Sequence, residues 1–266
     1  MYGAILGDIV GSPYEFDRSG KTKEFPLFVP ESRFTDDTVM TLAVADAFLS
    51  LASHPSDDQI LAALIKSMQH FGRRYSDIGY GAKFLCWLLC DDPQPYGSWG
   101  NGSAMRVASA GWLFGDPDTV RKMARLSAVV SHDHPEAVTG AEAVASAVFL
   151  ARTGSSKEEI KTYIQTHFCY DLSRSCDDIR PNYRHDVRCR GTVPEAITAF
   201  LEGCSFEDVI RTAVSLGGDC DTLTCIAGAM AEAYYGVPES LKDKVRQYLP
   251  PDLTDVLLRF CQRISC

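Results

Sequence analysis

The sequence predicts an all-α fold, arranged as one compact domain over residues 1–266. Apolar residues recur at the three- and four-residue spacing of amphipathic helices through most of the chain. The alternation of apolar and polar residues that indicates strands is scarce. Prolines stand where helices are expected to begin, at Pro117, Pro135, Pro194 and Pro238. A chain of 266 residues is also long enough to bury a full core.

The helical periodicity defines the expected elements in order. The first clear helix follows Thr35, and its apolar residues are Val39, Leu42, Ala43, Ala47 and Phe48. Further helices are expected at about 57–71, 78–90, 103–114, 117–130, 135–152, 157–168, 194–202, 206–215, 222–235, 238–248 and 253–264. No helix is assigned before Thr35, where Gly and Pro punctuate the chain.

Two segments, 17–33 and 170–192, are predicted to be irregular. The second could link two domains, but the helices on its two sides have similar composition, which favours a single domain. Loops of this length in a compact domain are often functional.

Composition narrows the possible classes of function. The formal net charge of −9 argues against general nucleic-acid binding and against docking on anionic membranes, which need a basic surface. A small anionic ligand stays possible, because backbone N–H groups can bind phosphate inside an acidic protein. No run of about 18 apolar residues predicts a membrane span. The first residues lack the basic start of a signal peptide, so we expect a cytoplasmic protein.

Ten cysteines are scattered along the chain without a CxxC pair. A zinc cluster is one interpretation of the loosely spaced set Cys169, Cys176, His185 and Cys189. Reduced thiols that pack as small hydrophobic side chains are the interpretation we favour.

Two acidic segments precede expected helices. They are Thr35-Asp36-Asp37-Thr38 and Gly217-Gly218-Asp219-Cys220-Asp221-Thr222. Helix capping accounts for one acid at a helix start but not for two. Hard divalent cations prefer oxygen ligands such as carboxylates and hydroxyls. If the segments converge, a cation would offset a repulsion of about 4 kcal/mol for each pair of charges 4 Å apart at an effective dielectric of 20.

Two further segments carry groups that suit ligand binding. The glycine loop, residues 98–106, reads Ser-Trp-Gly-Asn-Gly-Ser-Ala-Met-Arg and is either a phosphate-binding turn or a plain turn before a helix. Residues 131–135 read Ser-His-Asp-His-Pro, where a histidine can cap a helix, bind metal or contact a ligand. Asp8 and Glu15 near the N-terminus are either solvated or turned toward a metal.

Taken together and in order, these segments resemble the ADP-ribosylglycohydrolase family. The resemblance extends over about residues 3 to 236 and implies a compact all-α fold with a binuclear metal cleft for Mg²⁺ or Mn²⁺. By that resemblance the metal shell consists of Thr35, Asp36, Asp37, Asp219, Asp221 and Thr222. Asp36 and Asp37 are also expected to be catalytic together with Glu15, which resembles the family's mobile acid.

The resemblance also implies a substrate site. Its expected members are Asn101, Gly102 and Ser103 as the diphosphate cradle, His132 as a ribose or phosphate contact, and Met105 and Gly218. Ser98 stands where some relatives carry an Asp, so any acid role of that Asp cannot be assigned to this chain. This makes Glu15 the favoured candidate for the acid.

The function implied is a metal-dependent ADP-ribosyl hydrolase that cleaves the bond at the anomeric carbon of ADP-ribose. Its partner would be an ADP-ribosylated small molecule or protein side chain, and arginine, serine, guanidine, an acetyl ester or a nucleic-acid end stay open as leaving group. Tyr96, Trp99 and Tyr183 are candidates to stack on adenine. A non-catalytic ADP-ribose-binding protein and an HD-type metal phosphohydrolase are the alternatives; the second rests on the pairs His132-Asp133 and His185-Asp186.

Overall fold

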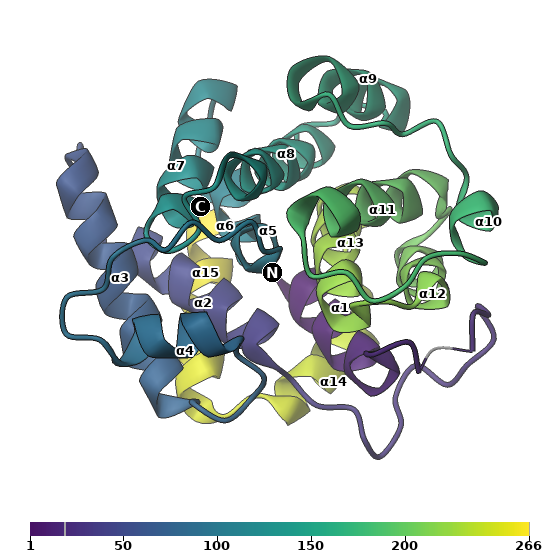
Figure 1. The fold of residues 1–266 in the computed structure, drawn as a ribbon, viewed down its shortest axis with the longest axis horizontal. Helices are drawn as coiled ribbons and strands as arrows, with labels where there is room; N and C mark the ends of the chain where they lie inside the picture. The colour runs from purple at the N-terminus through teal and green to yellow at the C-terminus, as the bar shows by residue number, and fades with distance from the viewer. Residues whose placement is uncertain (19, 266) are drawn as a thin grey trace.

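The computed structural model describes residues 1–18 and 20–265, and its helices confirm the all-α prediction (Figure 1). The elements are α1 (Tyr2–Gly11), the 3-10 helix η1 (Ser12–Tyr14), α2 (Asp36–Leu49), α3 (Asp57–Arg74), α4 (Ala82–Leu89), α5 (Gly102–Met105), α6 (Ala108–Leu113), α7 (Pro117–Val129), α8 (Pro135–Arg152), α9 (Lys157–Phe168), α10 (Cys176–Ile179), α11 (Cys189–Glu202), α12 (Phe206–Leu216), α13 (Cys220–Tyr235), α14 (Glu239–Tyr248) and α15 (Pro251–Ile264). Within the described residues, β pairing is limited to an isolated antiparallel bridge between Gly100 and Arg188. None of the described helices has the length and apolar character that a bilayer span requires.

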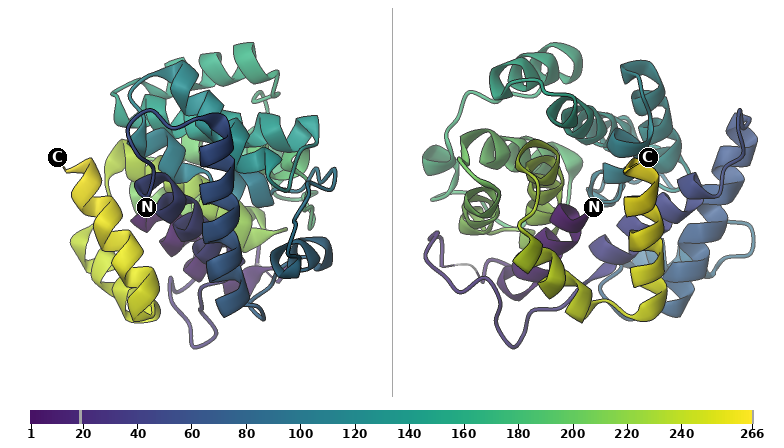
Figure 2. Two further views of the ribbon diagram at one scale, coloured as in Figure 1. Left: turned by 90° about the vertical axis from the view of Figure 1, so that its left-hand side faces the viewer. Right: turned by 180° about the vertical axis from the view of Figure 1, so that it is seen from behind.

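Helix α13 forms the centre of the fold. It is buried without interruption from Cys220 to Ala231, and a helix that is apolar on all sides needs neighbours on all sides. Those neighbours are α1, α8, α11 and α12. Figure 1 shows α1 lying beside α13 near the middle of the molecule, and Figure 2 shows α14 and α15 across the back. The N-terminal end of α13 is thereby held inside the protein.

Helix α1 was not expected from the sequence, so the assignment of Gly7–Glu15 as punctuated chain was wrong for its first half. Glycines at every fourth position, Gly3, Gly7 and Gly11, form one face of α1. A Cβ added at Gly7 would lie 2.2 Å from the carbonyl oxygen of Thr224 on α13. Only glycine permits two backbones to approach this closely. The packing outweighs the poor helix propensity of glycine.

Two expected helix boundaries also differ from the structure. Pro194 lies inside α11, which begins five residues earlier at Cys189 because the Cys189 N–H is fixed by the carbonyl of Trp99 (3.0 Å). The expected helix 103–114 is divided into α5 and α6. The carbonyl of Met105 accepts hydrogen bonds from Thr41 Oγ1 (3.1 Å) and Cys225 Sγ (3.6 Å). That carbonyl is thus used by α2 and α13 instead of continuing the helix.

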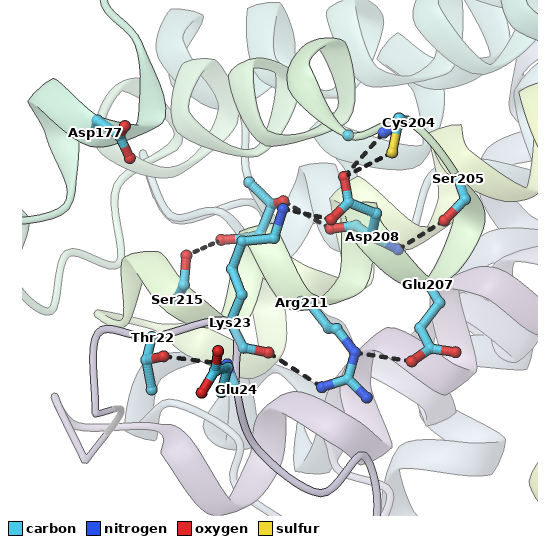
Figure 3. Close-up of polar contacts among 12 residues, drawn as sticks. Thr22, Lys23, Glu24, Asp177, Cys204, Ser205, Glu207, Asp208, Arg211 and Ser215 are labelled. Atoms are coloured by element: carbon cyan, nitrogen blue, oxygen red, sulfur yellow. Dashed lines mark hydrogen bonds and ion pairs between the residues drawn. The ribbon is translucent and has the colours of Figure 1, made fainter.

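The irregular segment after η1 is attached to α12 (Figure 3). Arg211 Nη1 donates to the carbonyls of Lys23 (3.1 Å) and Phe25 (2.7 Å), and its Nε pairs with Glu207 (2.8 Å). Lys23 forms an ion pair with Asp208. These contacts fix the middle of the segment between η1 and α2, whose first residues, Glu15 and Phe16, reach the cavity described below.

Candidate functional site

The two acidic segments converge at the N-terminal ends of α2 and α13. Thr222 Oγ1 donates a hydrogen bond to Asp37 Oδ2 at 3.2 Å, across 185 residues of sequence. Oxygen atoms of Asp8, Asp37 and Asp221 all lie within 4.8 Å of one another, and so do those of Glu15, Asp219 and Asp221. Asp221 belongs to both groups, which therefore form one continuous acidic centre.

The α2 side of this centre is held by Asp8, whose side chain is completely buried. Asp8 accepts hydrogen bonds from the backbone N–H of Thr35 (2.8 Å) and of Thr38 (3.1 Å), and from both threonine hydroxyls. Thr35 also caps α2 by accepting from the N–H of Asp37 (3.4 Å). Thr35 thus both caps α2 and binds Asp8 in the acidic centre. In the sequence, Asp8 is marked only as a single acid within an apolar run, next to Gly7 and three residues before Gly11.

The α13 side is held by an unusual backbone. Gly217 and Gly218 have φ values of 72° and 77°, which favour glycine. A Cβ on Gly218 would lie 2.5 Å from the ring of Tyr183. Asp219 accepts a hydrogen bond from Asn101 Nδ2 at 2.6 Å. The turn therefore sets the direction of Asp219, and the glycine loop supports that carboxylate.

Burial raises the pKa of every carboxyl group in the centre, and repulsion by neighbouring acids adds to this for Glu15, Asp36, Asp37 and Asp221. The pKa of Asp36 is raised to about 8, first by burial and then by the neighbouring Asp8. The pKa values of Asp37 and Asp221 lie well above the usual range, first because of burial and then because of nearby acids. Burial, followed by the charge of Asp219, raises the pKa of Glu15. A divalent cation reverses both effects, because it stabilises the charged form of each group.

The donor set fits hard divalent cations. Asp37 Oδ1 is buried and has no hydrogen-bond partner within the described residues, an arrangement that costs free energy unless another ligand binds that oxygen. All the groups that converge here are carboxylates and hydroxyls, the ligands that Mg²⁺ and Mn²⁺ prefer. Metal-ligand groups found among residues 1–18 and 20–265 contain no His or Cys.

The centre opens into a cavity of about 470 Å³. Ten of the expected site residues line it: Glu15, Asp36, Asp37, Asn101, Gly102, Met105, His132, Asp219, Asp221 and Thr222. Three do not. Thr35 is turned to Asp8, the Ser103 hydroxyl donates to the carbonyl of Ala137 (2.8 Å), and Gly218 packs under Tyr183. A wider depression of about 920 Å³ between α3 and residues 91–95 contains none of the expected residues.

The glycine loop is fixed by the segment 170–192, whose prediction as wholly irregular was wrong, because it contains α10 and the first residues of α11. The Asn101 N–H donates to the carbonyl of Val187 (2.8 Å), beside the bridge between Gly100 and Arg188. The side-chain amide of Asn101 donates to Thr192 Oγ1 (3.0 Å) as well as to Asp219. Asn101 thus supports the acidic side of the cavity through Asp219, and its own backbone N–H is engaged by the protein.

Sequence reasoning missed the apolar rim of the cavity. Phe16 and Val187 line the cavity and are each about half exposed, and the Phe16 ring lies 5.0 Å from that of His185. No local pattern marks these residues, because they meet only through the pairing of distant loops. Among the expected adenine-stacking candidates, Tyr96 lines the cavity, whereas Trp99 and Tyr183 do not.

The two alternative metal sites are not assembled. Asp133 accepts a hydrogen bond from the N–H of Gly97 (2.7 Å), and Asp186 pairs with Arg188 (2.7 Å). Neither His-Asp pair forms part of a metal-ligand group in the described chain, nor do the cysteines of the supposed zinc cluster. The Cys189 thiol is buried and donates to the carbonyl of Gly100 (3.2 Å).

Comparisons with known proteins identify the family of the chain. The sequence profile of the ADP-ribosylglycohydrolase family matches residues 1–265. The human protein named ADP-ribosylhydrolase ARH3 is 29% identical over an alignment that covers 99% of this chain and 92% of the relative. The ADP-ribosylarginine hydrolase Tri1 of Pseudomonas putida is 27% identical and covers 89% and 70%. A solved structure titled ADP-ribosylglycohydrolase-related protein complex shares the fold, with a TM-score of 0.73, 22% identity and coverage of 98% and 95%. The chain belongs to the ADP-ribosylglycohydrolase family.

Proposed function

We propose that this protein is a metal-dependent ADP-ribosyl hydrolase, which cleaves the bond at the anomeric carbon of ADP-ribose and releases free ADP-ribose. The observation that carries the proposal is the convergence of two acidic helix starts in a cavity that also contains the glycine loop and His132. Membership of the family supports the same activity, as do the names of the relatives.

Two divalent cations, Mg²⁺ or Mn²⁺, are the proposed cofactors. The residues that would hold them are Thr35, Asp36, Asp37, Asp219, Asp221 and Thr222. When bound, such ions polarise substrate oxygens and lower the pKa of water. Thr35 keeps an oxygen lone pair for this purpose, because its hydroxyl hydrogen is donated to Asp8 Oδ1 at 2.7 Å.

Glu15 is the proposed proton-transfer residue. It lines the cavity beside Asp219 and Asp221, and its raised pKa brings it closer to neutral pH, where a general acid or base works best. It would take a proton from the attacking water or return one to the leaving group. Glu15 is therefore the acid of the cavity lining that we assign to this role.

The other end of the cavity would bind the diphosphate. Gly102 and Ser103 remain the proposed cradle, with His132 above them, whereas Asn101 would act through Asp219. A diphosphate bound at this end would fix the orientation of the ribose at the acidic centre. Binding energy from a part of the substrate that does not react would then lower the barrier of the chemical step. The proposed partners are ADP-ribosylated small molecules or protein side chains. The single domain over 1–266 and the cytoplasmic location stay predictions from the sequence.

The first test is turnover of a small panel of conjugates with free ADP-ribose as the readout. ADP-ribosyl-arginine, ADP-ribosyl-serine, ADP-ribosyl-guanidine and O-acetyl-ADP-ribose are each incubated with Mg²⁺, Mn²⁺ or EDTA. Release that requires metal supports the proposal and identifies the leaving group. Binding of ADP-ribose without turnover of any conjugate would support the non-catalytic alternative instead.

A further inference from the structure

Arg106, the last residue of the glycine loop, is a buried charged group without a counter-charge. Its side chain is completely buried, and no carboxylate in the described part of the chain pairs with it. The guanidinium donates through Nη2 to the carbonyl of Ser127 (2.6 Å) and to the hydroxyl of Ser131 (3.0 Å). Arg106 also lines the cavity. The cavity lining therefore combines acids at the N-terminal end of α13 with a buried cation that has no carboxylate partner among the described residues.

The Ser131 hydroxyl connects this cation to His132. Its oxygen accepts from Arg106 and lies 2.8 Å from His132 Nδ1. A guanidinium can only donate, so it turns the hydroxyl oxygen toward itself and the hydrogen away. Within the described residues His132 Nδ1 is the acceptor that this hydrogen can reach. If Nδ1 carried the proton instead, both Arg106 and His132 would donate to the Ser131 hydroxyl oxygen. The hydroxyl hydrogen of Ser131 would then have no acceptor.

The ring of His132 is held in one orientation. Phe84 and Tyr96 pack against it edge to face, with ring centroids 5.9 Å and 5.6 Å from it. The Nε2 edge is turned to the glycine loop, since a Cβ on Gly102 would lie 3.1 Å from Nε2. Gly102 thus leaves room for a ligand atom beside Nε2.

The ring is also neutral in this setting. Burial, followed by the nearby charge of Arg106, lowers the pKa of His132 well below its usual value. A neutral imidazole carries one N–H, and the tautomer decides whether that group faces Ser131 or the cavity.

We infer that Arg106 and Ser131 are positioning residues that fix His132 as the Nε2–H tautomer, so that the ring donates a hydrogen bond to a phosphate oxygen of a nucleotide diphosphate lying over Gly102. The ligand half of this inference rests on the proposed function. The chemistry follows from the donor itself: a neutral N–H beside an unpaired cation in a partly buried cavity favours an anionic acceptor. The same donor would not bind a cation.

The tautomer is tested directly by ¹⁵N NMR of histidine-labelled protein without ligand, with His132 assigned through the His132→Gln variant. We expect a protonated Nε2 and an unprotonated Nδ1 in the wild type. Ser131→Ala should lose this preference and Ser131→Thr should retain it. Ser127→Ala is the matched control, because Ser127 is buried in the last turns of α7, four residues before Ser131, but its hydroxyl donates to the carbonyl of Ala124 (2.8 Å). A protonated Nδ1 in the wild type would overturn the inference.

The ligand half is tested by calorimetric binding of ADP-ribose. Gln can place an amide N–H near the position of Nε2, whereas Asn can mimic only Nδ1. His132→Asn should therefore weaken binding by about 10- to 100-fold, the usual size of one hydrogen bond to a charged group. His132→Gln should weaken it much less, and Ser131→Ala should raise KM more than it lowers kcat.

The outcomes separate this inference from the proposed function. Wild-type binding of ADP-ribose with equal affinity in Ser131→Ala and Ser127→Ala would overturn the inference alone. Binding that depends on Ser131 without turnover of any conjugate would overturn the hydrolase activity alone. Failure of the wild type to bind ADP-ribose would overturn both the proposed ligand and the ligand half of the inference, while the NMR result would still decide the tautomer.

Discussion

Asp8 and Thr35 are joined by two hydrogen bonds, from the Thr35 N–H to Asp8 Oδ2 (2.8 Å) and from its hydroxyl to Asp8 Oδ1 (2.7 Å). One end of this contact lies in α1 and the other caps α2. A buried carboxylate with four donors fixes the direction of the neighbouring oxygen ligands, and such supporting hydrogen bonds tune metal sites. Asp8 thus links the packing of α1 to the geometry of the acidic centre.

Replacing Asp8 with Asn should weaken the centre while preserving the size of the side chain. An amide offers one acceptor oxygen, so some of the four donors would stay buried without a partner, at a cost of about 1–3 kcal/mol. We expect a lower free energy of unfolding in saturating Mg²⁺ by urea titration, and about 10- to 100-fold weaker Mn²⁺ binding by calorimetry. Asp177→Asn, at an exposed carboxylate, serves as control. Equal Mn²⁺ affinity in both variants would contradict the role given to Asp8.

Replacing Gly7 with Ala should destabilise the contact between α1 and α13. The added Cβ would meet the backbone of Thr224 at 2.2 Å, and backbone cannot move aside as a flexible side chain does. Overpacking of this kind costs about 1–3 kcal/mol, which urea unfolding would measure. Gly115→Ala is the control, because a Cβ there meets nothing within 4 Å. Similar stability of the two variants would mean that the helices can separate without penalty.

Replacing Asp36 or Asp219 with Ala should remove metal and activity together. Both residues belong to the proposed metal shell, and loss of a carboxylate ligand lowers affinity for hard cations. Bound Mn²⁺ per chain, measured after dialysis, should fall in parallel with turnover. Full activity with normal metal content in either variant would show that the metal shell is assigned wrongly.

Replacing Glu15 with Gln should separate chemistry from metal binding. The amide has the size of the carboxyl group but cannot transfer a proton at neutral pH, and loss of a general acid or base lowers kcat by about 10²- to 10⁴-fold. KM and Mn²⁺ content should change little compared with Asp219→Ala. A wild-type kcat would remove Glu15 from the mechanism.

The metal-free protein should become less stable as pH rises. The folded-state pKa values of the acidic centre are raised, that of Asp36 to about 8. A group with a raised pKa stabilises the fold below its unfolded pKa, and this contribution is lost as pH rises through the folded value. His132 has the opposite sign, because its pKa is lowered, so its contribution is lost only as pH falls below about 6.5.

The pH range from about 6.5 to 8.5 isolates the carboxyl groups from His132. The Tm in EDTA should fall across this range, and saturating Mg²⁺ should reduce the fall, since the cation stabilises the charged carboxylates. Parallel curves with and without Mg²⁺ would contradict a metal site at these residues.

The sequence predicted most helices because their periodicity and caps are local. Ser56 and Ser156 cap α3 and α9 through capping boxes, which depend only on residues three positions apart. The sequence-based prediction failed at α1, because its glycines are typical of irregular chain. The helix forms there because those glycines pack against the backbone of Thr224 and Gly228. The prediction also failed at Pro194, because the start of α11 is decided by a hydrogen bond from another loop.

In the candidate site, too, local features could be predicted from the sequence, whereas contacts between distant segments could not. The carboxylates of Asp36, Asp37, Asp219 and Asp221 could be singled out from residue type and from their excess over what helix capping needs. Their convergence was not readable, since 185 residues separate Asp37 from Thr222. The role of Asn101 toward Asp219 and the burial of Asp8 likewise depend on which helices pack together.

The sequence by itself determined the helical class and the acidic helix starts whose carboxylates suit hard cations, because periodicity, capping and side-chain type act over a few residues. The tertiary structure decided which of those acids meet, which oxygen lacks a partner, and which nitrogen of His132 faces the cavity. Those properties depend on distances and burial between segments far apart in the chain, and only the packing of α1, α2 and α13 sets them.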